Sequence, residues 1–234
     1  MTENKEPKKR IRRTKIAIDR DVLNAVNSLI EEVGFANVNL TSIAQRAKIE
    51  STVFYRRYNS LEDLFDRYTE KYDFWFSNIA ESIPLDQSDE DIFKTLLSNL
   101  ITALYKSKGM QQLLIWELSD DNKTTRKTAR LREMINEPLI QMLEARFGNS
   151  GININAISAI VISGIYYLIL HRKRSTFCRV DFATKEGKKQ LDTAVNQLIS
   201  ILYQVARSQQ EKIDIADKLR AEGVSEEIIR KCIN

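Results

Sequence analysis

Residues 39–65, NLTSIAQRAKIESTVFYRRYNSLEDLF, carry the strongest local structural signal in this chain of 234 residues. Asn39 is a good N-cap, because its side chain accepts hydrogen bonds from free backbone N–H groups at the start of a helix. The helix that follows places Ile43 and Ala47 on one apolar face. Residues 48–50, Lys-Ile-Glu, form the expected turn. The stretch therefore predicts two short helices joined by a tight turn.

The second short helix, expected over residues 51–58, has two different sides. Phe54 and Tyr58 are four residues apart and point towards a core. The outer side is left with Ser51, Thr52, Val53, Tyr55, Arg56 and Arg57. A turn between two short helices, the second of them polar, is the layout of a helix-turn-helix, whose second helix enters the major groove of DNA.

Two helices are expected to flank this motif. The first has Asp19 as its N-cap and ends at Gly34, where a positive φ is needed. Its apolar face is formed by Val22, Val26, Leu29, Ile30 and Val33. The other begins after Ser60, with Asp63 at the reciprocal capping-box position, and runs to about residue 79. That length takes it out of the motif and into a second domain.

Composition favours an all-α fold, since seven Gly and three Pro leave little room for many tight turns. Further helices are expected near residues 89–107, 110–119, 123–147, 154–173 and 185–210, with a kink or break at Pro138. The predicted domains are a disordered basic arm (1–17), a three-helix DNA-binding domain (18–66), a helical regulatory and dimerisation domain (67–210) and an appendage of two short helices (211–234).

Charge is unevenly distributed along the chain. Residues 1–15 hold seven Lys or Arg and two Glu, a balance of +5, whereas the net charge of the whole chain is +4. A basic arm on a near-neutral body favours an anionic partner, with nucleic acid ahead of a membrane surface. A solvated terminus without a partner is the alternative.

Metal, redox and membrane chemistry find little support in the sequence. Cys178, Cys232 and the single His171 lack metal-ligand spacing, so no metal or cofactor is expected, and the thiols fit a reducing cytoplasm. The most apolar run, residues 156–170, is shorter than the roughly 20 residues that span a bilayer, so a buried helix is expected. An enzyme is not expected, because nucleophile, base and phosphate-loop patterns are missing.

Residues 47–64, AKIESTVFYRRYNSLEDL, resemble the TetR/AcrR family of transcriptional regulators. At the matching positions the family's own pattern is A-G-V-S-x-G-T-L-Y-x-H-F-x-S-K-E-x-L. The resemblance is close over about residues 15–66 and elsewhere covers only length and helix pattern. Lys48 replaces the turn glycine and would be strained by roughly 1 kcal/mol at a positive φ. Glu50 replaces the usual serine, Val53 a hydroxyl residue, and Leu61 a lysine that contacts phosphate.

The resemblance implies which residues contact DNA. Tyr55 is expected to contact a phosphate and Arg57 another, and Lys48 is a further candidate for a phosphate contact. Ser51, Thr52 and Arg56 are candidates for base edges, since Arg can bind O6 and N7 of guanine together. Thr41 and Ser42, at the start of their helix, are candidates for gripping the DNA backbone.

The resemblance also implies a homodimer on a palindromic DNA operator. Two reader helices must lie roughly 34–36 Å apart to reach successive grooves. The interface candidates are Ile157, Ile160, Val161, Gly164, Leu168, Leu191, Val195, Leu198 and Leu202. An intramolecular core made by the same residues is the alternative.

Relatives bind a small molecule in the second domain and then leave the operator, so a repressor released by a hydrophobic or aromatic ligand is expected. The pocket candidates are Trp75, Phe76, Tyr105, Trp116, Glu117, Tyr166 and Tyr167, each of which could be plain core instead. The alternatives that stay open are a ligand-independent or nucleoid-associated DNA-binding factor, an enzyme and a membrane-surface adaptor.

Overall fold

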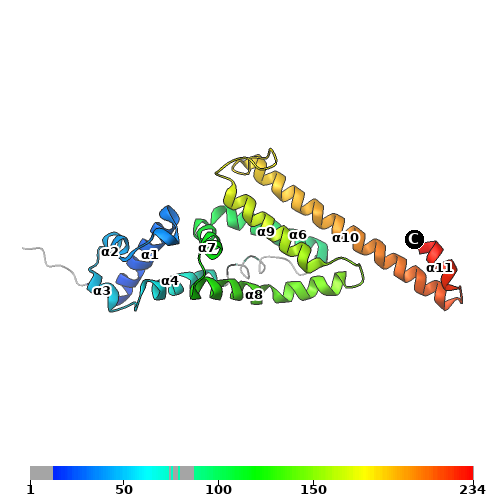
Figure 1. Cartoon of the computed structure of the whole chain (residues 1–234), viewed down its shortest axis with the longest axis horizontal. Helices are drawn as coiled ribbons and strands as arrows, with labels where there is room; N and C mark the ends of the chain where they lie inside the picture. The colour runs from blue at the N-terminus through cyan, green and yellow to red at the C-terminus, as the bar shows by residue number, and fades with distance from the viewer. Residues whose placement is uncertain (1–12, 74, 76–78, 80–86, 234) are drawn as a thin grey trace, which may run out of the picture. The chain divides into compact units, whose positions relative to one another are not determined.

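The computed structural model describes residues 13–73, 75, 79 and 87–233 of the chain, and most of these residues are in helices (Figure 1). The described part contains no β-strand, only an isolated bridge between Phe177 and Val180. The all-α prediction is confirmed. The chain divides into two compact units, Met1–Lys71 with Gln112–Arg126, and Tyr72–Gln111 with Lys127–Asn234.

Four α-helices build most of the first unit: α1 (Lys15–Val33), α2 (Leu40–Ala47), α3 (Ser51–Tyr55) and α4 (Leu61–Thr69). Two 3₁₀ turns, η1 (Phe35–Asn37) and η2 (Glu70–Tyr72), follow α1 and α4. The prediction of Asp19 as the cap of α1 is wrong. Thr14 caps α1, and its hydroxyl accepts a hydrogen bond from the N–H of Ala17.

The core of this unit gathers apolar side chains from every helix. Its largest fully buried members are Ile30, Ile43, Phe54, Leu64 and Leu113. Trp116, on the part of α7 (Lys108–Ser119) that belongs to this unit, stacks on Phe35 with ring centroids 4.3 Å apart. Burial of this kind supplies the stability that helices as short as α2 and α3 lack alone.

Local capping fixes where α2 and α4 begin. The predicted cap at Asn39 is confirmed, with a full capping box in which Ser42 bonds back to Asn39. Ser60 caps α4 as predicted. The carboxylate of Asp63 bonds to the N–H of Asn59 rather than to that of Ser60, so the reciprocal bond lies one residue earlier than expected.

Two predicted helices end earlier than expected. The second helix of the motif stops at Tyr55 and not at residue 58, so Arg56 is its C-cap. The fourth helix stops at Thr69, where the hydroxyl of Thr69 donates to the carbonyl oxygen of Asp66, and η2 follows. The predicted continuation to residue 79 is interrupted there.

The second unit contains α6 (Asp89–Lys106), most of α8 (Lys123–Phe147), α9 (Ile154–His171), α10 (Lys185–Ala221) and α11 (Glu226–Ile233). The predicted helices near 89–107, 110–119, 123–147 and 154–173 are confirmed within two residues. Pro138 lies inside α8 and does not split it. Buried side chains of α6, α9 and α10 form the core, for example Leu97, Ile165, Ile169, Ile199 and Tyr203.

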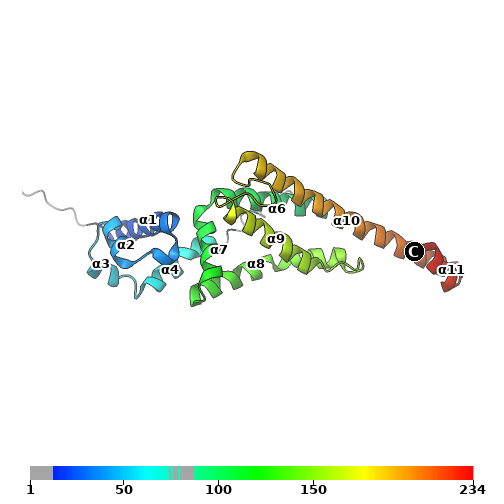
Figure 2. The ribbon, with the colours of Figure 1, turned by 45° about the horizontal axis from the view of Figure 1, so that its top comes forward.

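The C-terminal region differs from its prediction. Residues 211–221 do not form a separate short helix, because α10 is continuous over 37 residues. Only α11 is short, and Ile229 on it is fully buried while Ala216 on α10 is nearly so. In Figures 1 and 2 the distal part of α10 extends past the other helices of this unit and carries α11 at its end.

The start of α10 is held against the loop before it. The hydroxyl of Thr184 accepts a hydrogen bond from the N–H of Gly187, and the carbonyl of Asp181 lies directly beside Gly187. A β-carbon at residue 187 would lie only 2.0 Å from that carbonyl oxygen. The hydroxyl of Tyr105 on α6 donates to the carbonyl of Phe182 at 2.8 Å and fixes the same loop from the other side.

One helix among the described residues, α9, is apolar and long enough to cross a membrane when judged by length and composition alone. Only 22% of α9 is buried, so the prediction of a buried helix is wrong, and one such helix is weak evidence of a membrane span.

Candidate nucleic-acid interface

The outward face of α3 is polar, as predicted. Phe54 is 1% exposed and Tyr58 2%, whereas Tyr55 is 60% exposed. Ser51, Thr52 and Arg56 are exposed beside Tyr55. The buried pair anchors the helix, so hydroxyl and guanidinium groups are presented to solvent on a fixed backbone.

Lys48 lies in the turn between α2 and α3 with φ 54° and ψ 51°, the left-handed conformation. Its N–H donates to the carbonyls of Ala44 and Gln45, which ends α2. The strain predicted for a lysine at the glycine position therefore applies. The side chain of Lys48 is exposed next to α3.

Of the two hydroxyl residues at the start of α2, Ser42 is already hydrogen-bonded within the protein and Thr41 is exposed. The hydroxyl of Ser42 donates to the carbonyl of Asn39 at 2.7 Å and accepts from the N–H of the same residue. Thr41 is exposed. Thr41 is therefore the better placed of the two predicted backbone contacts.

Arg57 lies apart from the exposed set. Its Nη1 is 2.6 Å from Oδ1 of Asp19 on α1, and its side chain is only 15% exposed. This ion pair ties the end of the α3 region to α1. A phosphate contact by Arg57 remains a prediction, and in the free protein the charge already has a partner.

Arg13 was missed by sequence reasoning beyond its count in the basic arm. Its Nη1 donates to the carbonyl of Ala47 at 3.0 Å and lies 3.4 Å from a carboxylate oxygen of Asp21. The residue thus fixes the chain entering α1 beside the end of α2. Residues 1–12 of the predicted arm lie outside the described residues.

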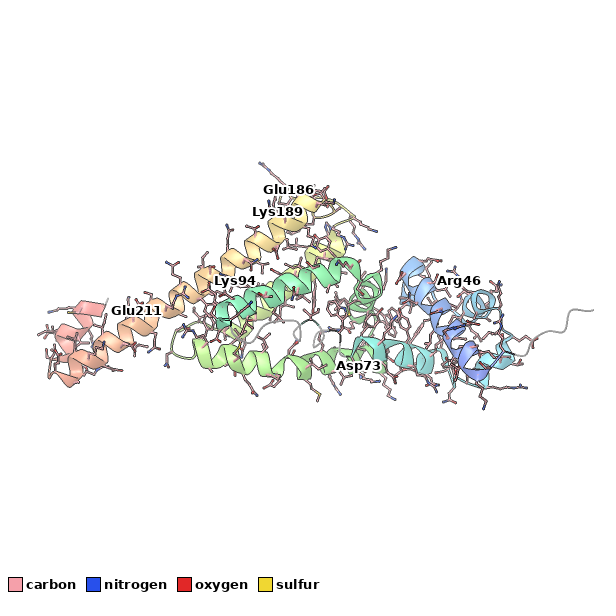
Figure 3. All side chains as sticks on the ribbon, turned by 180° about the vertical axis from the view of Figure 1, so that it is seen from behind. Arg46, Asp73, Lys94, Glu186, Lys189 and Glu211 are labelled. Carbon is pink, nitrogen blue, oxygen red and sulfur yellow. The ribbon has the colours of Figure 1, made fainter. Side chains whose placement is uncertain are left out.

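The single arginine of α2 forms an ion pair within the first unit. Arg46, labelled in Figure 3, pairs with Glu32 through two guanidinium nitrogens at 2.5 and 2.8 Å. The hydrogen bond from Arg46 lowers the pKa of the Glu32 carboxyl, with a further bond from Ser28. The charge of Arg46 is therefore already paired within the protein, whereas Arg56 has no ion pair among the described residues.

The predicted ligand-pocket residues lie in different surroundings. Trp116 is core in the first unit, stacked on Phe35, with its indole N–H donating to Asp120 at 3.0 Å. Tyr105 is bonded to Phe182, and burial raises the pKa of its phenol. Tyr167 is half-exposed and stacks on His171. Trp75, Glu117 and Tyr166 are partly buried, and Phe76 lies outside the described residues.

The predicted dimer face of α10 divides in two. Leu191 and Val195 are buried within the second unit, so they are not available to a partner. Leu198 is 50% exposed, and Ile201, one turn further, is 55% exposed. On α9, Ile160 is 69% exposed, while the other predicted residues, Ile157, Val161, Gly164 and Leu168, and Leu202 on α10, are partly buried.

The described side chains include no group of three or more His, Cys, Asp or Glu that would suit a metal ion. Cys178 and Cys232 are both exposed and unbridged.

A short polar helix held outward by buried aromatic residues, preceded by a capped helix and a three-residue turn, defines a helix-turn-helix unit. No family model and no curated protein matches the chain. Solved structures do. The fatty acid degradation regulator FadR from Bacillus halodurans aligns with a TM-score of 0.60 at 15% identity, over 80% of this chain and 96% of its own.

A TetR-family transcriptional regulator from Vibrio parahaemolyticus aligns with a TM-score of 0.54 at 14% identity, over 77% of this chain and 97% of its own. An AcrR-family regulator from Aquifex aeolicus aligns with a TM-score of 0.56 at 18% identity, over 79% and 99%. The chain therefore has the all-helical fold of the TetR/AcrR transcriptional regulators, and the resemblance seen in residues 47–64 is confirmed at the level of the fold.

Proposed function

We propose that this protein is a sequence-specific DNA-binding transcriptional regulator that acts in the cytoplasm. The observation that carries the proposal is that α3 and the turn after it have a buried side, Phe54 with Tyr58, and an exposed polar side. A rigid helix that presents Ser51, Thr52, Tyr55 and Arg56 suits base edges and phosphates in a major groove. Lys48 and Thr41 flank it with groups that suit the DNA backbone.

The regulator is proposed to be a homodimer that binds a palindromic operator. Support comes from Ile160, Leu198, Ile201 and Val205, which are 41–69% exposed. Large apolar side chains exposed on neighbouring helices are typical of protein interfaces. A two-fold pair would bury the same surface of each subunit and present two copies of α3.

The regulator is further proposed to be a repressor released by a small hydrophobic or aromatic ligand. Support comes from the similar proteins of known structure, which are named as regulators, one of them as a fatty acid degradation regulator. Thermal-shift screening with apolar small molecules, followed by DNA-binding assays on the hits, separates this mechanism from a ligand-independent factor. A hit that stabilises the protein and lowers DNA affinity is expected.

Selection of bound duplexes from a random pool, followed by footprinting, tests the DNA proposal. A palindromic consensus protected by the protein is expected. Arg56→Ala should then weaken consensus binding by about 1–3 kcal/mol and relax preference at one base position per half-site. Arg174→Ala, which removes an exposed arginine of the second unit, should leave both unchanged. If no sequence is enriched, the proposal is wrong.

A further inference from the structure

A cavity of about 530 Å³ opens beside α3 in the first unit. It is lined by Arg13, Lys15, Ile18, Asp19, Val53, Arg56, Arg57 and Arg67. Five of these eight residues are cations and one is an anion. The lining comes from the first turns of α1, from α3 and from α4, so three elements distant in sequence converge on it.

The single carboxylate in the lining is already neutralised. Asp19 pairs with Arg57 at 2.6 Å, so these two residues contribute no net charge. The remaining lining charges, on Arg13, Lys15 and Arg56 together with Arg67, are all positive. Arg13 and Arg67 each lie 3.4 Å from a carboxylate outside the lining, on Asp21 and Asp63, so the unpaired positive charge of the cavity rests on Lys15 and Arg56.

The remaining cations differ in how firmly they are held. Arg67 lies 5.1 Å from the ring centre of the buried Tyr58 and 3.4 Å from Asp63, which orient its guanidinium group. Arg13 is held by the carbonyl of Ala47. Lys15 and Arg56 have no ion pair among the described residues, and both are exposed. Two oriented guanidinium groups and two free cations leave capacity for an external anion.

The start of α1 adds to this field. Lys15 is the first residue of a 19-residue helix, and Ile18 belongs to its first turn. The positive end of a helix dipole therefore lies at the cavity wall, together with backbone N–H groups that have no partner inside the helix. An oxyanion such as phosphate has several acceptor oxygens, so it can accept hydrogen bonds from these N–H groups and from arginine side chains at the same time.

We propose that this cavity binds a phosphate group, and that the group is a DNA backbone phosphate next to the bases that α3 contacts. The second part rests on the proposed function. Val53 and Arg56 belong to the α3 region and line the cavity, so a phosphate held there lies alongside the reader helix. Lys15 and Arg67 then act as DNA-positioning residues outside the helix-turn-helix motif. A free phosphorylated molecule offers the same chemistry.

The test compares the salt dependence of binding to a mixed-sequence duplex, so that no operator is required. Lys15→Gln and Arg67→Gln should each lower the slope of log affinity against log salt concentration by about one, and should weaken binding to all sequences by the same factor. Lys189→Gln, at an exposed lysine of the second unit labelled in Figure 3, and Arg174→Gln serve as matched controls with unchanged slopes. Circular dichroism verifies that each variant is folded.

A second arm uses inorganic phosphate without DNA, at constant ionic strength, and follows the arginine Nε–H signals by nuclear magnetic resonance. Shifts at Arg56 and Arg67 that are lost in Lys15→Gln, with unchanged salt slopes in the first arm, would assign the site to a free phosphorylated molecule. Reduced slopes assign it to DNA. If the slopes stay the same and phosphate shifts neither signal, the cavity is not a phosphate site.

The two proposals fail in different ways. A wild-type protein that binds no duplex at all overturns the regulator function, and the phosphate titration alone then decides the role of the cavity. A wild-type protein that binds DNA while the salt slopes ignore Lys15 and Arg67, with no phosphate shifts, keeps the regulator function and overturns only the cavity assignment.

Discussion

The two units leave opposite kinds of surface uncovered. On the first, the exposed side of α3 is polar and cationic, with Tyr55 and Arg56 in solvent. On the second, α10 exposes Leu198 and Ile201. Water solvates the polar surface at little cost, whereas exposed apolar area is unfavourable by about 25 cal/mol per Å². Covering the second surface should therefore stabilise the protein, whereas covering the first should add little stability.

The largest expected effect tests whether α3 depends on its buried side. Phe54→Ala should lower the free energy of unfolding of the first unit by about 3–5 kcal/mol, because a large side chain that is 1% exposed is replaced by a cavity. Urea denaturation followed by Trp116 fluorescence in a Trp75→Phe background measures it. Tyr55→Ala, on the exposed side, should change stability by less than about 0.5 kcal/mol. Equal effects would mean that α3 has no inner and outer face.

The next effect tests the apolar surface. Leu198→Glu should weaken the proposed homodimer by about 2–4 kcal/mol, roughly 30- to 1,000-fold in dissociation constant, since two-fold symmetry would place two buried charges in one interface. Sedimentation equilibrium measures the change. Leu118→Glu is the matched control, because Leu118 is 84% exposed and belongs to the first unit. If the wild-type protein is already a monomer, the exposed apolar surface of α10 is not a dimer interface, and the prediction is wrong.

A smaller effect concerns an internal ion network of the second unit. Burial raises the pKa of Glu90, but hydrogen bonds from Lys94, Arg207 and Ser200 outweigh it and lower the pKa to about 2. The distances from Lys94 and Arg207 are both 2.7 Å. Because the folded pKa is below the unfolded value of 4.5, the stabilisation is complete above about pH 4.5 and is lost as pH falls towards 2.

Glu90→Gln should therefore cost about 1–2 kcal/mol of unfolding free energy near pH 7, after allowance for solvent screening, and much less near pH 2.5. Urea unfolding at both pH values, with Glu211→Gln on the exposed distal part of α10 as control, measures the difference. A cost that is independent of pH would show that the carboxylate charge is not the stabilising feature.

The smallest effect separates strain from function on the polar surface. Lys48→Gly should raise the stability of the first unit by about 0.5 kcal/mol, because relief of about 1–2 kcal/mol of left-handed strain exceeds the entropy cost of glycine. The same change should weaken DNA binding in a gel-shift titration if Lys48 contacts phosphate. Lys218→Gly, within regular α10, should instead lower stability by about 1 kcal/mol. Unchanged DNA affinity would leave Lys48 with no role at the interface.

Features of the fold that arise from neighbouring residues were predictable from sequence. The capping box of Asn39 and Ser42, and the positive φ of Gly34 after α1, depend on a few adjacent residues. The inward direction of Phe54 and Tyr58 follows from helical spacing. These features placed the helix-turn-helix correctly.

Features that depend on distant residues were not predictable. The pairing of Arg57 with Asp19 joins positions 38 residues apart, and nothing local marks it. Local reasoning instead assigned Asp19 to a helix cap. Contact with α6 decides which side of α10 is covered, so Leu191 and Leu198 could not be told apart by their shared helical pattern.

One missed feature did carry a local signal. The apolar spacing of α10 weakens near residues 207–210, RSQQ, where the predicted helix ends. No Gly or Pro occurs between Gly187 and Gly223, and the intervening residues are mostly good helix formers. Helix propensity therefore predicts one continuous helix to Ala221, even though the apolar periodicity is interrupted near residue 210.

Residue 187 is a glycine, and only its lack of a β-carbon lets the backbone carbonyl of Asp181 approach it so closely. With any larger substituent at this position, the carbonyl of Asp181 and the first turn of the longest helix cannot occupy their present places together. This close packing couples the preceding loop to the first turn of α10, so we expect a displacement of residues 181–184 to move the start of this 37-residue helix as well.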